Sequence, residues 1–503
     1  MQVTTSWTIF WQTLFCCLAI TPSAVHAREV VLKQCESQLY SSSAAERCGE
    51  VDVALDHLGD NSRKLAAPVR MVLSGNPDAS TRPPIIWLNG GPGMGNMDSA
   101  ASSVLSKDFD IVHIGYRGVD FGPDLSCDNI AHAITSSKRL LIDGVTSLQA
   151  AIEQCIDAME ADGYSANSIT LAQTVHDIDG VLEALNIEQA HFVGGSFGTR
   201  IALIYQEVFP ERVAKSVLLG ANPPGRTIWM PAALDKVLGR IADICTSSTR
   251  CSGSSEAMSM ALRISDRAVQ SGYPLPFDMA RARVTAFLLA YDNTVLPMIV
   301  DAFEDANKGD ATGLHTLAMA HDFALPRAGI VWGHFVLMAA TADLDETVDY
   351  RVALAQSDGA PFGSPMAQLF WPAIQGLDLP LITPAYRRLK ENDIEILLIS
   401  GALDVSAPYE QVRDEIIPYR QNATHWIIED AGHYNLYTSD IMREVGHFLT
   451  GDIAQQPTVP VPLVLRENIG LSDILKIGVS VIVLVISLFA WTVIRFLKRA
   501  RHS

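Results

Sequence analysis

Basic residues are scarce in this chain. Its 503 residues include 37 Lys and Arg against 56 Asp and Glu, which gives a formal net charge of −19. Nucleic acids and anionic lipid headgroups would be repelled by such a chain, so we expect neither as a partner. Charged residues make up only 18% and hydrophobic residues 48%, a composition that predicts a substantial core and argues against wholesale disorder.

The chain also lacks the residue spacings of common metal sites. It contains no CxxC and no HExxH, and short spacings of this kind are typical of structural and catalytic zinc. We therefore expect no metal and no cofactor.

Both ends of the chain are hydrophobic. Residues 9–20 (IFWQTLFCCLAI) precede Val25-His26-Ala27, which has small residues at the two positions that a cleavage site needs. This pattern predicts a signal peptide over residues 1–27, although no Lys or Arg precedes the apolar stretch. An uncleaved anchor is the alternative.

Near the other end, residues 477–494 (IGVSVIVLVISLFAWTVI) carry no charge. As a helix this segment would be about 27 Å long, close to the roughly 30 Å thickness of a bilayer core. A buried core helix is the alternative, but the basic tail at 495–503 favours a membrane helix with a cytoplasmic tail. The rest of the chain would then face the periplasm from a bacterial inner membrane, or the exterior or a lumen in other cells.

Six cysteines lie outside the predicted signal peptide, and an even number in an exported chain suggests disulfides. The simplest pairing joins neighbours along the chain, although six cysteines allow about 15 connectivities. The three candidate pairs are Cys35 with Cys48, Cys127 with Cys155, and Cys245 with Cys251.

Short apolar runs rich in β-branched residues alternate with helical patterns along much of the chain. Near-continuous apolar runs are typical of strands buried on both faces of a parallel sheet, and the alternation indicates an α/β fold with a mostly parallel central sheet. The predicted strands are 68–75, 84–91, 111–118, 191–195, 214–220, 394–401 and 425–430, and the helices beside the fourth of them are 172–185 and 197–209.

Residues 227–384 show helical patterns and no strand pattern, so we predict a helical insertion over the sheet, called the cap below. Expected helices within it include 232–244, 258–270 and 295–306. The sequence thus predicts a signal peptide (1–27) and a core in two parts (28–226 and 385–451) separated by the cap (227–384). A Pro-rich linker (452–476), a membrane helix (477–494) and a basic tail (495–503) follow.

The sequence Gly194-Gly195-Ser196-Phe197-Gly198 is a GxSxG motif between a predicted strand and a predicted helix. This is the setting of a nucleophile elbow, in which a tight turn exposes a serine hydroxyl at a helix N-terminus. A glycine-rich turn with an incidental serine is the alternative. The context favours Ser196 as a catalytic nucleophile.

A nucleophilic serine needs a base and an orienting acid, which in this fold follow later strands in the order Ser, acid, His. Asp404 follows the predicted strand that ends at Gly401, and His433 follows the final strand. Glu429 and Asp430 are rival acids, but they fall within or directly after the strand that leads to the histidine. We therefore expect Ser196, Asp404 and His433 to form a triad.

An oxyanion hole needs two backbone N–H groups. Phe197, which follows the nucleophile, is one expected donor. The other is expected from Asn89-Gly90-Gly91-Pro92-Gly93, with Gly91 preferred and Gly90 the alternative, because glycines allow the backbone to approach the reacting group closely.

The motifs NGGPG, YRG (116–118), GGSFG, GALD and AGH together resemble the prolyl aminopeptidase and tripeptidyl aminopeptidase family of α/β-hydrolases, from about Cys48 to His433. The family's usual HGGPG has Asn89 here, and Phe197 stands where Trp is frequent. The resemblance implies a serine exopeptidase that cleaves peptides from a free N-terminus through an acyl-enzyme. It also implies acidic residues that hold the substrate amine; the cap offers Asp292, Asp301, Glu304 and Asp305, although a solvated helix face explains these more simply.

Two other functions fit the same motifs. An esterase or lipase uses the same triad on esters or other amides, and an apolar tunnel under the cap would favour it, whereas convergent carboxylates would favour an aminopeptidase. A non-catalytic binding ectodomain usually loses a member of the triad, and this chain keeps all three.

Overall fold

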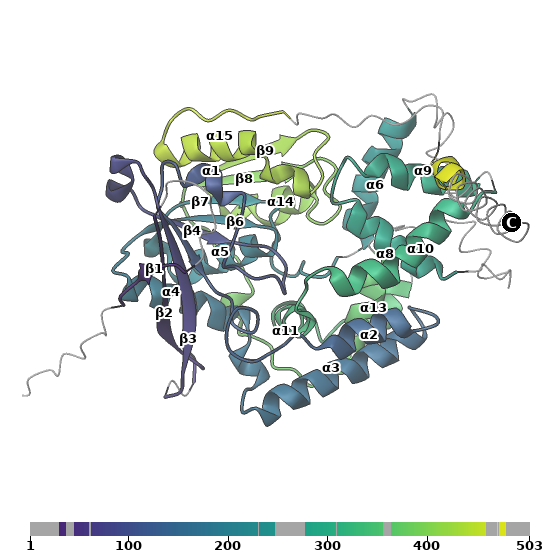
Figure 1. Cartoon of the computed structure of the whole chain (residues 1–503), viewed down its shortest axis with the longest axis horizontal. Coiled ribbons are helices and arrows are strands. Elements are labelled where there is room, and N and C mark those ends of the chain that lie inside the picture. Colours follow the sequence, from purple (N-terminus) through teal and green to yellow (C-terminus); the bar gives the residue numbers. More distant parts are fainter. Residues whose placement is uncertain are drawn as a thin grey trace, which may run out of the picture.

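The structure is a computed structural model of the whole chain (Figure 1). It describes residues 30–36, 45–59, 62–229, 231–246, 277–307, 309–355, 364–458, 470 and 472–478. The predicted signal peptide, the predicted cap helix 258–270, residues 479–494 of the predicted membrane helix and the basic tail lie outside these ranges.

A nine-stranded sheet forms the centre of the core, in the order β1-β2-β3-β5-β4-β6-β7-β8-β9. All pairs from β5 onward are parallel, as expected from the apolar runs, whereas the pairs among β1, β2, β3 and β5 are antiparallel. Each of the seven predicted strands is present within a few residues. The bounds are Lys33–Gln34, Ala45–Ala54, Lys64–Leu73, Ile85–Leu88, Ile111–Ile114, Ala190–Gly195, Val213–Leu219, Ile396–Gly401 and Ala423–Ile428 for β1 to β9.

Helices cover both faces of this sheet (Figure 1). Along β6, Phe192 belongs to the hydrophobic cluster on the side of α4 and α5, whereas its neighbour Val193 belongs to the cluster on the side of α1 and α15. Successive side chains of a strand point to opposite faces, so a strand that is apolar at every position can contact both helical layers. The bounds are Ser102–Leu105 for α1, Leu171–Ala184 for α4, Phe197–Val208 for α5, Tyr409–Glu415 for α14 and Ser439–Thr450 for α15.

The segment between β7 and β8, where the sequence analysis places the cap, is helical. Its helices are α6 (Pro231–Thr246), α8 (Met279–Leu289), α9 (Leu296–Asn307), α10 (Thr312–Ala324), α11 (Trp332–Asp343), α12 (Tyr350–Ala355) and α13 (Ser364–Gln375). Two further helices, α2 (Asp128–Ser136) and α3 (Asp143–Ala161), belong to the predicted first core segment but lie against α11 and α13 (Figure 1). The helical layer over the sheet edge is therefore built from two separate parts of the chain.

Part of the predicted linker is also helical. Residues 472–478 form a short helix beside α9 and α10. The Ser472 hydroxyl accepts a hydrogen bond from the N–H of Gly313 at 3.2 Å, and Lys476 pairs with Asp310. Ser472 is buried and Leu475 packs against the main hydrophobic cluster, so these contacts explain why this part of the linker is not extended.

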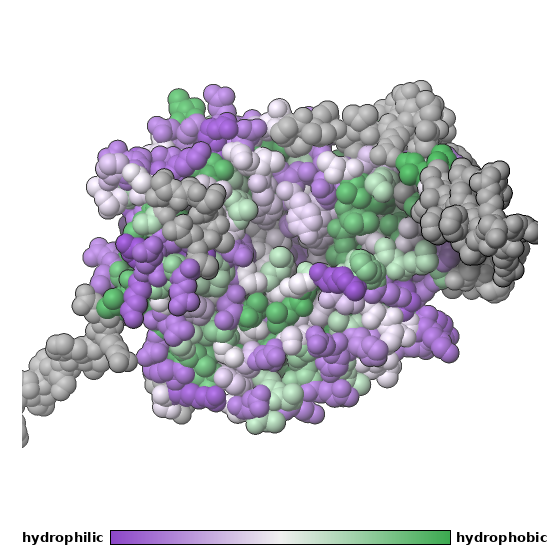
Figure 2. All heavy atoms as spheres, in the orientation of Figure 1, coloured by the Kyte–Doolittle hydropathy of each residue, from purple (hydrophilic) through white to green (hydrophobic). Residues whose placement is uncertain are grey.

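Within the described ranges, no single helix has the length and apolar character to cross a membrane; one bent pair, Thr312–Arg327 with Trp332–Asp343, passes that test by length and composition. The surface in Figure 2 is mostly hydrophilic over the N-terminal strands and carries more hydrophobic side chains over the cap.

Two of the three predicted disulfides lie within the described residues, and both are formed: Cys35 bonds to Cys48, and Cys127 to Cys155. The second bond joins α2 to α3 and lies against the start of α11, where a Cβ at Gly333 would meet both sulfur atoms within 3 Å. The third predicted pair lies outside the described part of the chain: the side chain of Cys245 and the whole of Cys251 are not described.

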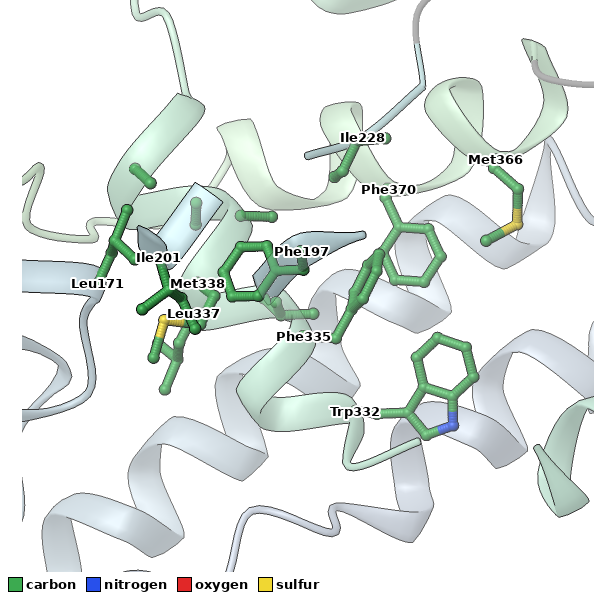
Figure 3. Packing of buried hydrophobic residues seen from close by; sticks show 14 of the residues in the cluster. Leu171, Phe197, Ile201, Ile228, Trp332, Phe335, Leu337, Met338, Met366 and Phe370 are labelled. Carbon is green, nitrogen blue, oxygen red and sulfur yellow. The ribbon is translucent and has the colours of Figure 1, made fainter. Parts of the chain in front are cut away.

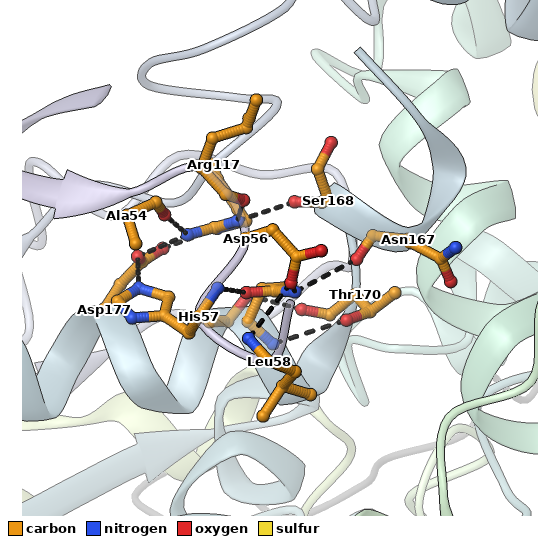
Figure 4. Close-up of polar contacts among 12 residues, drawn as sticks. Ala54, Asp56, His57, Leu58, Arg117, Asn167, Ser168, Thr170 and Asp177 are labelled. Carbon is orange, nitrogen blue, oxygen red and sulfur yellow. Dashed lines mark hydrogen bonds and ion pairs between the residues drawn. The ribbon is translucent and has the colours of Figure 1, made fainter. Parts of the chain in front are cut away.

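Arg117 of the YRG motif is a structural residue. Its buried guanidinium forms an ion pair with Asp177 of α4 and donates to the carbonyl oxygens of Ala54, Leu55 and Ser168 (Figure 4). A buried arginine is stable only when its N–H groups are paired in this way. The motif therefore joins β2, the segment after β5, and α4.

Candidate active site

Ser196 lies at the junction of β6 and α5, in a conformation rarely adopted by residues other than glycine. Its φ is +51°, and its N–H donates to the carbonyl oxygen of Leu219 at 2.9 Å. The flanking glycines leave no room for side chains: a Cβ at Gly198 would lie 2.2 Å from the carbonyl oxygen of Leu88, and one at Gly194 would lie 2.8 Å from that of Gly198. This geometry is that of a nucleophile elbow.

Asp404 and His433 lie side by side, although 29 residues separate them. The Nδ1 of His433 is 2.7 Å from the Oδ2 of Asp404, and both residues are buried. The other carboxylate oxygen accepts the N–H groups of Ser406 and Ala407, each at 2.8 Å. The carboxylate is thereby fixed in the orientation that leaves the Nε2 of His433 available for another partner.

The imidazole also lies next to the strand end that Ser196 contacts. Gly220 directly follows Leu219, and a Cβ at Gly220 would be 2.8 Å from the Cε1 of His433 and 3.3 Å from Oδ2 of Asp404. Gly220 has φ of +59°, so it needs glycine for both space and backbone conformation. Ser196 and the Asp404–His433 pair therefore both lie next to the end of β7, at the carboxyl edge of the parallel strands.

The rival acids have other positions. Glu429 is exposed, and Asp430 has φ of +58° at the start of the loop that carries His433. The backbone carbonyl of Asp430 accepts a hydrogen bond from the side chain of Asn293 at 2.7 Å. Among these three carboxylates, only Asp404 has a described hydrogen bond to His433.

The two predicted oxyanion donors come from different segments near Ser196. Phe197 begins α5, and Figure 3 shows its ring among side chains of α11, including Phe335 and Leu337. Residues 89–96, called the oxyanion loop below, follow β4 and approach the serine closely: a Cβ at Gly90 would lie 2.8 Å from the Cβ and 3.4 Å from the Oγ of Ser196. Gly91 has φ of +125°, which also favours glycine.

The core holds the oxyanion loop through two asparagines. The N–H of Asn89 donates to Asn96 Oδ1 at 2.7 Å, and Asn96 donates to the carbonyl oxygens of Trp87 and Ile114. The side chain of Asn89 accepts from the indole N–H of Trp87 at 2.7 Å. Asn89, at the position where the resembled family has histidine, therefore fixes the start of the oxyanion loop to the end of β4.

The cap contacts the loops that carry the acid and the histidine. Arg240 of α6 donates to the carbonyl oxygen of Ala402, two residues before Asp404, at 2.7 Å. Tyr291 follows α8, and its carbonyl oxygen accepts the N–H of Tyr434 at 2.8 Å. The ring of Tyr291 lies edge-on to that of His433, with centroids 5.0 Å apart. Sequence patterns did not predict these contacts, because nothing in the local sequence marks them.

A buried ion pair joins the nucleophile helix to the cap. Arg200 of α5 and Asp343, at the end of α11, are both fully buried, with 2.7 Å between Arg200 NH1 and Asp343 Oδ1. Asp343 also accepts the N–H groups of Gly225 and Thr227. Burial alone would raise the pKa of Asp343, but the charge of Arg200 and these hydrogen bonds hold it below its ordinary value.

Replacing Asp343 with asparagine should therefore destabilise the protein by about 3–5 kcal/mol, because a buried guanidinium loses its counter-charge. Chemical denaturation of both proteins measures this difference. The contribution of a carboxyl with a lowered pKa is present above its unfolded pKa of about 3.9 and is lost as the pH falls through the folded pKa, so the two proteins should converge in stability under acid conditions.

An exposed ion pair offers the control: Asp440→Asn removes the partner of Arg443 and should lower the free energy of unfolding by about 0.5 kcal/mol or less. Equal effects of the two changes would contradict the expectation.

The acidic residues of the cap are not the solvated helix face that we expected. Asp301 and Glu304 of α9 are buried, and Asp305 is half-buried. Asp292 lies in the loop before α9, where its Oδ1 accepts the N–H and hydroxyl of Thr294. The three-to-four spacing that places Asp301, Glu304 and Asp305 near one another on a helix is compatible with a buried face as well as with a solvated one.

Comparison with known proteins agrees with this architecture. Residues 83–241 match the family model described as alpha/beta hydrolase fold. The tripeptidyl aminopeptidase of Streptomyces lividans is 24% identical over 204 residues, or 38% of each chain. Serine protease Hip1 of Mycobacterium tuberculosis is 27% identical over 193 residues, or 35% of this chain and 36% of that one. The chain thus spans less than two fifths of the length of these two relatives.

Among solved structures, the proline iminopeptidase of Mycobacterium smegmatis matches with a TM-score of 0.41 at 14% identity, over 80% of this chain and 98% of that one. The family match covers the segment that contains the oxyanion loop, the YRG motif and the elbow around Ser196. Residues 83–241 thus match the α/β-hydrolase fold, and parts of the chain are similar in sequence to a tripeptidyl aminopeptidase and to a serine protease.

Proposed function

We propose that the chain is a serine hydrolase in which Ser196, His433 and Asp404 act as nucleophile, base and orienting acid. The observation that carries this proposal is the 2.7 Å contact between Asp404 and His433 beside the elbow that bears Ser196. Ser196 attacks the scissile carbonyl while Nε2 of His433 takes its proton, and Asp404 stabilises the imidazolium. The N–H groups of Phe197 and Gly91 stabilise the oxyanion.

His433 then gives its proton to the leaving group, and an ester bond joins the acyl group to Ser196. Water, deprotonated by His433, attacks this acyl-enzyme and releases the acid, which restores the serine hydroxyl. The hydroxyl, the imidazole and the N–H donors suffice for both half-reactions, so no cofactor enters the proposal.

We further propose that the substrates are peptides with a free N-terminus. The support is the similarity to a tripeptidyl aminopeptidase and to serine protease Hip1. The cap adds two buried carboxylates, Asp301 and Glu304, and carboxylates are the groups that would bind a cationic amine. In this proposal they are the candidates for that role.

The test is a substrate panel for residues 28–478, which keep the short helix 472–478 that packs against the cap. Peptide amides with free and with blocked N-termini are compared with a short-chain ester, and Ser196→Ala serves as the inactive control. We expect the enzyme to cleave the peptide with a free N-terminus and not the blocked one, because a blocked amine carries no positive charge for the enzyme to bind. The length of the released product gives the number of residues removed. Turnover of the ester alone would favour the esterase function and overturn the peptidase proposal.

Export and anchoring remain part of the proposal. The two disulfides are consistent with an oxidising compartment, and the apolar segments at 9–20 and 477–494 supply the predicted signal and anchor. The predicted domain boundaries at 27, 226, 384, 451, 476 and 494 are part of the same proposal and rest on the sequence patterns. Protease added to intact spheroplasts should digest the domain between the two segments; full protection of that domain would contradict the proposed orientation.

A further inference from the structure

One residue of the oxyanion loop has both of its backbone polar groups bonded to the cap. The N–H of Gly93 donates to Nδ1 of His334 at 2.9 Å, and the carbonyl oxygen of Gly93 accepts the N–H of Val331 at 2.8 Å. Val331 and His334 lie at the start of α11, and 241 residues separate Gly93 from His334. The contact therefore links the edge of the core sheet to the cap.

The contact is also sterically close. A Cβ at Gly93 would lie 2.7 Å from the carbonyl oxygen of Val331 and 2.9 Å from a methyl carbon of Ile330. Gly93 has φ of +89°. Glycine is thus required both for the backbone conformation and for the approach of α11.

His334 is suited to this hydrogen bond because it is uncharged. An imidazole nitrogen that accepts a hydrogen bond from an N–H group carries no proton, so the ring proton lies on Nε2. His334 is 2% exposed, and burial lowers its pKa to about 3. The ring therefore remains an acceptor throughout the neutral pH range.

This hydrogen bond constrains the proposed oxyanion hole. Because the N–H of Gly93 is bonded to His334, it is not free to bind an oxyanion. Gly91 lies between two fixed points of the loop, Asn89 on the core side and Gly93 on the cap side. A shift of Gly93 would be transmitted through Pro92, whose ring restricts rotation, to the N–H group of Gly91.

We propose that His334 of the cap is a positioning residue for the oxyanion loop, which it holds through Nδ1 so that Gly91 faces the carbonyl attacked by Ser196. The inference rests on the proposed function. It makes the start of α11 part of the machinery that stabilises the transition state, although His334 itself touches no reacting atom. An error of about 1 Å in the position of such a donor can cost roughly 100-fold in rate.

The test compares His334→Leu with His334→Asn. The Oδ1 of asparagine is attached at the same branch point as Nδ1 of histidine and can accept the hydrogen bond, whereas leucine cannot. With the ester or peptide that the wild type hydrolyses, and rates expressed per titrated active site, we expect leucine to lower kcat by about 10- to 100-fold with little change in KM. Asparagine should keep kcat within about 5-fold of wild type.

A boronic acid, which mimics the tetrahedral intermediate, gives a second readout. Its affinity should fall in the leucine variant by about the same factor as kcat, since both depend on the oxyanion donors. Loss of stability alone would change the amount of folded protein but neither of these values per active site. Hydrogen exchange in residues 87–97 should also be faster in the leucine variant than in the asparagine variant.

His191→Leu is the matched control, because His191 is a buried histidine on β6 whose pKa burial lowers to about 4. It should leave kcat per active site unchanged.

If the leucine variant at position 334 fails to fold, His334→Gln replaces it, since the glutamine amide oxygen lies one bond beyond the Nδ1 position and does not reproduce the hydrogen bond there. Unchanged kcat and boronic acid affinity in the leucine or glutamine variant would overturn the inference. An asparagine variant whose kcat falls as far as that of the leucine variant would also overturn it. Activity that survives Ser196→Ala would instead overturn the proposed function.

Discussion

Ser196→Ala should lower kcat by about 10⁵-fold or more for any substrate that the wild type hydrolyses, because the acyl-enzyme can no longer form. KM should change little, since the binding surface is intact. Steady-state kinetics at high enzyme concentration measure the residual rate. A fluorophosphonate probe, which labels an activated serine, should modify the wild type and not the variant.

Ser216→Ala is the matched control for this change. Ser216 is a buried serine on the neighbouring strand β7, and its hydroxyl contacts Gln206 rather than His433. It should keep both kcat and labelling by the probe. If the Ser196 variant retained most of its activity, the GxSxG turn would be only a turn, and the nucleophile would have to be sought elsewhere.

Asp404→Asn should lower kcat by about 10⁴-fold. The amide keeps the size of the carboxylate, but it cannot accept the Nδ1–H of His433 in the same way once its own NH₂ group faces the ring. The histidine then adopts the wrong tautomer and its protonated form is no longer stabilised. Kinetics over a range of pH measure the loss, and stability should be checked because Asp404 also accepts two backbone N–H groups.

Glu429→Gln tests the rival assignment directly. Glu429 lies close to His433 in sequence but is exposed, so its replacement should leave kcat within about 3-fold. A large loss in this variant, together with a small loss in Asp404→Asn, would reverse the assignment of the acid.

The strand series was predicted with few errors because parallel strands buried on both faces leave long apolar runs. The antiparallel start of the sheet was not predicted as such, since β2 alternates between exposed and buried residues and its partner β3 is also partly exposed. The helices α2 and α3 were assigned to the core because they lie between core strands in sequence. Their amphipathic patterns do not say which neighbour each buried face will meet.

The sequence by itself determined where reactive groups can gather. Ser196, Asp404 and His433 each follow a parallel strand, and the carboxyl ends of such strands lie along one edge of the sheet. Only the tertiary structure decided which carboxylate contacts the histidine, and that the cap holds the oxyanion loop through His334. Those contacts join residues that are far apart in the chain, and their energies depend on burial and on distances of about 3 Å, which no local pattern of residues encodes.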